Sequence, residues 1–137
     1  MKGHHQDNEN IKIDLQRNTF NSLINVLEYI ADKEAISNYN DCLTYVNVFI
    51  EIYEQWKSLY LIKQKWFLEI FTEEQLIQLN KFNKEFICFF DTNDIEKNFV
   101  EVINSDEWIK ISLIADKVLL DIQMMPPAPS RIPSRGT

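Results

Sequence analysis

Glycine and proline are almost missing from the interior of the sequence. Glycine occurs only at positions 3 and 136, and the four prolines lie at positions 126, 127, 129 and 133, so the 122 residues from His4 to Met125 contain neither. A β-protein of this size needs turns that glycine usually provides, whereas helices can begin at Asn, Asp, Ser and Thr caps. We therefore predict an all-α fold, a compact antiparallel bundle of four to five helices.

The residues that most enzymes use for acid–base or phosphate chemistry are also scarce. Both histidines lie within the first five positions, and Arg17 is the only arginine before position 131. A cysteine or serine nucleophile would lack a histidine base, and a Glu-x-x-His metal site would lack its imidazoles. Without glycine-rich loops the chain has no phosphate-binding motif. The sequence predicts a protein that is not an enzyme and that uses no metal and no cofactor.

Cysteine and long apolar runs are limited as well. Cys42 and Cys88 are too few for a disulfide scaffold, and we expect both thiols to be reduced and packed in apolar surroundings. The sequence contains no secretory leader pattern and no run of 18 uncharged apolar residues. We expect a cytoplasmic protein without a membrane partner.

Acidic residues are abundant. The chain has 21 Asp and Glu against 14 Lys and Arg, a net charge of -7 over 137 residues, and all the acids lie before position 122. This balance disfavours nucleic-acid binding, which requires clustered basic side chains. With 45% hydrophobic residues the chain is long enough to bury one core. We divide it into a flexible N-terminus at 1–12, a single helical domain at 13–124 and a Pro-rich extended tail at 125–137.

Apolar periodicity predicts where the first helices lie. A first helix from about Asp14 to Lys33 is followed by a turn at 37–41. A second helix begins near Asp41 with Tyr45 in its apolar stripe, and it either continues to about Glu69 or breaks near Lys57. Within the stretch 59–71 the apolar residues fall on every side of a helix rather than on one stripe. We therefore expect this stretch to be the most buried element.

Capping signals predict the later helices. Thr72 and Gln75 have the spacing of a capping box, which starts a helix at Glu73. A short helix is expected at 94–103. Ser105 then caps a last helix that runs to about Gln123.

The acid excess and the absence of a catalytic constellation favour binding over catalysis. We expect an acidic immunity- or antitoxin-type inhibitor of bacterial origin that occludes a basic partner protein, with acids for steering and exposed aromatics for anchoring. The alternative is a helical structural adaptor, chaperone or complex subunit that works through an apolar groove, and a homo-oligomer stays open. The candidate acids are Glu51 and Glu54, or Glu69, Glu73 and Glu74, and the candidate aromatic anchors are Tyr53 and Tyr60.

Overall fold

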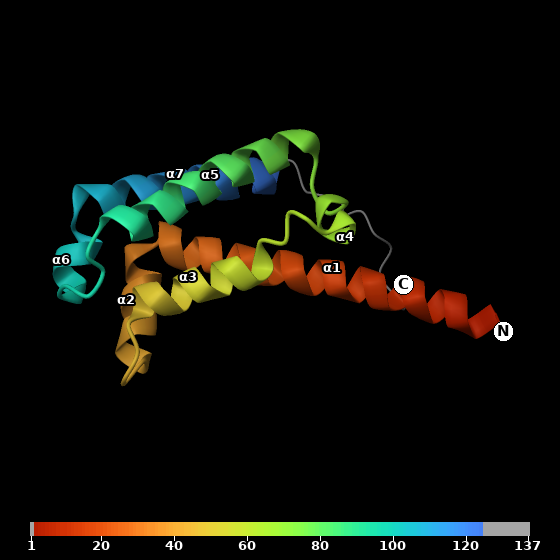
Figure 1. Ribbon diagram of the computed structural model, residues 1–137, viewed down its shortest axis with the longest axis horizontal. Coiled ribbons are helices and arrows are strands. Elements are labelled where there is room, and N and C mark those ends of the chain that lie inside the picture. The colour runs from red at the N-terminus through yellow and green to blue at the C-terminus, as the bar shows by residue number, and fades with distance from the viewer. Residues whose placement is uncertain (1, 125–137) are drawn as a thin grey trace.

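The computed structural model describes the backbone of residues 2–124 and the side chains of residues 9–123 (Figure 1). Within this range the chain forms helices and no strand, which confirms the all-α prediction. The predicted tail at 125–137 lies outside the described residues. The helices are α1 (Lys2–Ala31), α2 (Lys33–Cys42), α3 (Val48–Leu59), α4 (Lys65–Leu68), α5 (Glu73–Thr92), α6 (Phe99–Ile103) and α7 (Asp106–Met124).

The long helices form two layers (Figure 1). Helices α5 and α7 lie side by side in one layer, and α1 and α3 form the other, with α1 packed against both α7 and α3. Helix α4 joins the layers at one end of the molecule, and α2 and α6 lie at the opposite end. The first turns of α1 project beyond the rest of the molecule.

The core forms where the apolar stripes of the long helices meet. Trp56 of α3 is completely buried, and its ring makes an edge contact with Phe82 of α5 at a centroid distance of 4.9 Å. The indole N–H of Trp56 donates to Asn83 Oδ1 at 2.8 Å, so its polar atom is satisfied as well. Burial of such a side chain stabilises the fold by about 1.5–3 kcal/mol. Trp56 therefore links the two layers.

Both predicted helix starts that rest on caps are confirmed. The Thr72 hydroxyl accepts from Gln75 N at 3.2 Å, and Gln75 Oε1 accepts from Thr72 N at 2.9 Å, which is the reciprocal capping box. Ser105 Oγ accepts from Trp108 N at 3.2 Å at the start of α7. These caps satisfy backbone donors that the first turn of a helix leaves unpaired.

The turn predicted at 37–41 is wrong, because α2 occupies it. Asp32 ends α1, and its carboxylate accepts from the N–H groups of Glu34 and Ala35, which starts a new helix. Ile36 then becomes completely buried and holds that helix in place. The following helix begins at Val48 instead of near Asp41, and Tyr45 lies in the loop before it rather than in an apolar stripe.

The first helix begins at Lys2 rather than near Asp14, so no break marks the expected boundary at residue 13. Two contacts join α1 to the α4 region, and the first of them involves the part of α1 before Asp14. Lys12 Nζ lies 2.7 Å from Glu69 Oε2, and Gln16 Nε2 donates to the carbonyl oxygen of Trp66 at 3.0 Å. These long-range partners cannot be read from local periodicity.

The expectation that 59–71 is the most buried element is also wrong. The helix breaks after Leu59, and the segment is a turn with the four-residue helix α4. Phe67, Ile70 and Phe71 are buried in the core, whereas Leu68 stays exposed. The many apolar residues of this segment therefore belong to a short connection between α3 and α5 that is only partly buried. The predicted short helix at 94–103 is confined to Phe99–Ile103, because Asn98 caps it.

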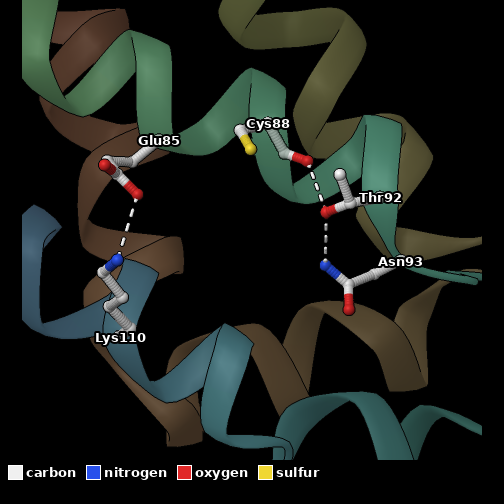
Figure 2. Close-up of polar contacts among 5 residues, drawn as sticks. All are labelled: Glu85, Cys88, Thr92, Asn93 and Lys110. Carbon is white, nitrogen blue, oxygen red and sulfur yellow. Dashed lines mark hydrogen bonds and ion pairs between the residues drawn. The ribbon is translucent and has the colours of Figure 1, made fainter.

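The two cysteines are not packed as expected. Cys42 is the last residue of α2, and Cys88 lies on α5 one turn after Glu85 (Figure 2), and both side chains are exposed. The apolar neighbours of each cysteine in the sequence point to other sides of the helix. Phe89, for example, is buried while Cys88 faces outward.

Candidate partner-binding site

The structure places the two predicted groups of acids toward opposite ends of the molecule. Glu51 lies in the first turn of α3, at the end where α6 is found, and the exposed Glu54 follows one turn later. Glu69, Glu73 and Glu74 lie where α4 meets the start of α5. The 20 residues of α5 span about 30 Å between these ends. The two groups therefore belong to different surfaces.

The acids at the α4 end have roles inside the fold. Glu69 is paired with Lys12, and this pairing lowers the pKa of the Glu69 carboxyl and raises the pKa of the Lys12 ammonium group. Glu73 and Glu74 occupy the first turn of α5, where a negative charge favours the helix dipole. Among the residues whose side chains the structure describes, no exposed aromatic side chain lies at the α4 end with these acids.

Tyr53 and Tyr60 pack against the core and are only half exposed. The ring of Tyr53 stacks on Phe90 with centroids 4.5 Å apart, and Lys57 Nζ lies 5.0 Å from the Tyr53 centroid. The ring of Tyr60 stacks on Trp56 at 5.2 Å, and burial raises the pKa of Tyr60 to about 12. Both rings make contacts within the protein and keep only part of their surface open to solvent, and their role as anchors stays a prediction.

A different tyrosine is the exposed one. Tyr45, in the loop between α2 and α3, keeps 97% of its side-chain surface open to solvent. Val46, Ile50 and Val100 are exposed by 53%, 40% and 60%. The sequence interpretation missed Tyr45, because its spacing fits the apolar stripe of a helix that in fact begins only at Val48.

Two contacts bring these residues to one end of the molecule. Asn47 Nδ2 donates to the carbonyl oxygen of Ile95 at 2.7 Å, while its Oδ1 accepts from Phe49 N at 2.8 Å and caps α3. The ring of Phe49 stacks on Phe99 with centroids 5.5 Å apart. The loop before α3 is thereby fixed against the segment that leads into α6.

Exposed carboxylates lie on the segments that these contacts bring to this end. Asp94 and Glu96 lie in the loop that Asn47 contacts, Glu101 lies in the first turn of α6, and all three are exposed. The stretch 91–107 contains six acids and one lysine, and Lys33 of α2 reaches it through a bond from Nζ to Asn104 Oδ1 at 2.8 Å, so acids outnumber bases there. We call this surface the acidic end, and it comprises Tyr45, Val46, Ile50, Glu51, Asp94, Glu96, Val100 and Glu101.

Among the described residues, no group of three or more His, Cys, Asp and Glu side chains is placed to hold a metal ion. None of the helices over this same range is long and apolar enough to cross a membrane. The chain matches no protein-family model, no curated protein and no solved structure. A functional assignment therefore depends on the surface chemistry of this chain.

Proposed function

We propose that the protein is a non-enzymatic binding module, an acidic immunity- or antitoxin-type inhibitor that occludes a basic site on a partner protein. The observation that carries this proposal is the acidic end, where Tyr45 is exposed by 97% and Asn47, two residues on, bonds to the segment that carries Asp94 and Glu96. Of the two predicted acid groups, the pair Glu51 and Glu54 on α3 lies at this end, with Glu51 in the first turn of the helix. The proposed chemistry, acids for steering and an exposed aromatic for anchoring, is the one expected from the sequence. The residues that would supply it are now Tyr45, Asp94, Glu96 and Glu101.

Binding would proceed in two physical stages. The carboxylates of Asp94, Glu96 and Glu101 attract a cationic surface over a distance of about 8–10 Å at physiological salt. Tyr45 then supplies the apolar contact that holds the complex, because tyrosine is enriched among the residues that dominate interface energies. Charge sets the association rate, and Tyr45 mainly sets the dissociation rate.

The acidic end is also well held before any partner arrives. Asn47 bonds to the backbone on both sides of the surface, and Phe49 makes an edge contact with the buried ring of Trp108 at 4.8 Å. A loop that is already ordered loses less conformational entropy on binding than a free loop does. The scaffold thus supports tight occlusion of a partner by a small surface.

The alternative from the sequence, a helical adaptor, chaperone or complex subunit with an apolar groove, is favoured by another observation. Helix α7 exposes Leu113 by 65% and Leu120 by 51% on its outer side. Lys110 and Lys117 of α7 lie beside Leu113 on this surface. It would serve a different partner from the one expected at the acidic end.

The test uses the protein as bait in lysate of its source organism, with elution in steps of rising salt. We expect a basic protein that the wild type retains and that Tyr45→Ala combined with Glu96→Lys and Glu101→Lys loses. The matched control is Glu73→Lys with Glu74→Lys, which reverses two exposed charges at the α4 end and should retain the partner. Equal retention by both variants would refute an interface at the acidic end.

A further inference from the structure

The outer side of the α5 and α7 layer carries an exposed apolar stripe. Ile109, Leu113 and Leu120 of α7 keep 44%, 65% and 51% of their side-chain surface exposed, at spacings of four and seven residues. Such spacings place the three side chains on one side of a helix. The opposite side of α7, with Ile111, is buried against the rest of the fold, so among the described residues nothing covers the stripe.

Two shallow depressions lie along this stripe. The first has a volume of about 440 Å³ and is bounded by Ile109, Leu113 and Ile114. The second, of about 380 Å³, lies between α5 and α7 and shares Ile114 and Lys117 with the first. Because they share these two lining residues the depressions are neighbours, and we call them together the outer groove.

Lysines line the outer groove. Lys81 and Lys84 reach it from α5, and Lys110 and Lys117 reach it from α7, whereas its acids are Glu85 and Asp106. Glu85 Oε2 is already paired with Lys110 Nζ at 3.3 Å, across the gap between the two helices (Figure 2). The groove therefore has a local positive balance in a chain whose net charge is -7.

We propose that the outer groove binds an amphipathic helix of a partner protein, with an apolar side flanked by Asp and Glu. The stripe from Ile109 to Leu120 is about 16 Å long, which matches three turns of a docked helix. Apolar side chains of the partner would fill the depressions, and its carboxylates would meet Lys81, Lys84 and Lys117. This surface goes beyond the inhibitor function, because its partner has the opposite charge.

Charge also disfavours the other occupants of the groove. The tail at 125–137 contains Arg131 and Arg135 and no acid, so the lysines would repel it. A second copy of the chain would bring together two molecules that each carry a net charge of -7. The basic partner expected at the acidic end would likewise be repelled.

The test uses two synthetic helical peptides of about 15 residues with the same leucine stripe. One has Glu on both flanks of the stripe and its twin has Lys at those positions. Fluorescence anisotropy of each labelled peptide gives Kd at low and at physiological salt. We expect the Glu peptide to bind the wild type, and Leu113→Glu to weaken that binding about tenfold or more.

A matched control accompanies Leu113→Glu. Ile11 on α1 is exposed by 64%, against 65% for Leu113, so Ile11→Glu makes the same change at a site remote from the groove and should leave Kd unchanged. The double variant Lys81→Glu with Lys117→Glu should raise the Kd of the Glu peptide. The binding that remains should depend less on salt. The Lys peptide, which the acidic end attracts, should be insensitive to Leu113→Glu.

Three kinds of result would overturn the proposal. One is no binding of the Glu peptide to the wild type at millimolar concentration. Another is a wrong response of the Leu113→Glu variant: an unchanged Kd for the Glu peptide, or a loss of binding of the Lys peptide. The third is a wild-type dimer in sedimentation equilibrium that Leu113→Glu dissociates, which would assign the groove to a second copy. Because the acidic end is unaltered in these variants, the inhibitor function is tested separately.

Discussion

The acidic end and the outer groove expose similar apolar side chains and surround them with opposite charges. Tyr45 and Ile50 lie among carboxylates, whereas Leu113 and Ile109 lie among lysines. The net charge of the whole chain describes only the first of these surfaces. Composition therefore favours the proposal of a basic partner, whereas the lysine-lined groove becomes visible only when α5 and α7 lie side by side.

The two surfaces also differ in how the fold holds them. The acidic end is built from loops that Asn47 fixes to the backbone of a distant segment. The outer groove lies on two long helices whose inner sides form the core. A change in the core should therefore disturb both surfaces, and a change at Asn47 should disturb only the acidic end.

The largest expected effect comes from Trp56→Ala, which removes the link between the layers. The residue is completely buried, so its loss leaves a cavity and should lower the free energy of unfolding by about 3–5 kcal/mol. Both surfaces would weaken together as the unfolded fraction rises. Urea denaturation followed by circular dichroism measures the effect, and a loss below about 1 kcal/mol would show that Trp56 does not join the layers as described.

A smaller and selective effect is expected from Asn47→Ala. The variant loses the cap of α3 and the bond to the carbonyl oxygen of Ile95, which together should cost about 1–2 kcal/mol of stability. Binding of a basic partner should weaken, while the Glu peptide keeps its Kd at the outer groove. Equal weakening of both ligands would mean that the two surfaces are not independent. Thr72→Ala, which removes the cap of α5 at the α4 end and leaves the acidic end untouched, is the matched control.

The smallest effect is expected at the Lys12 and Glu69 ion pair, which lies on neither surface. The pairing lowers the pKa of Glu69, so its contribution is present above the unfolded pKa and is lost as pH falls through the folded value. The pairing raises the pKa of Lys12, so that contribution is lost as pH rises through the folded value. Melting temperatures of Glu69→Gln and the wild type should differ slightly near neutral pH and converge at both extremes. A difference that persists at acid pH would contradict this account.

The sequence predicted the features that depend on neighbouring residues. The capping box at Thr72 and the cap at Ser105 are local, because the two partners of each hydrogen bond lie three residues apart in the sequence. The end expected near Gln123 for the last helix also agrees with α7, which ends at Met124. Such signals do not depend on how the helices pack.

The sequence failed where several residues could have ended or begun a helix. Asp32 and Asn47 are the caps that the fold uses around α2, and Ser37, Asn38 and Asp41 offered the same chemistry nearby. Burial of Ile36 favours one choice, and that burial depends on helices distant in the sequence. Because the helix start was expected near Asp41, Tyr45 was assigned to the apolar stripe of a helix. Its exposure at the acidic end was therefore not predicted.

The central claim, that one small helical protein carries two docking surfaces of opposite chemistry, is tested most directly by amide chemical shifts. The ¹⁵N-labelled protein is titrated with the Glu peptide and then with the Lys peptide in the same sample. We predict that the Glu peptide shifts amides around Ile109 and Leu113, that the Lys peptide shifts those around Tyr45 and Glu96, and that neither displaces the other. Shifts at the same amides with both peptides, or displacement of the first by the second, would contradict the claim.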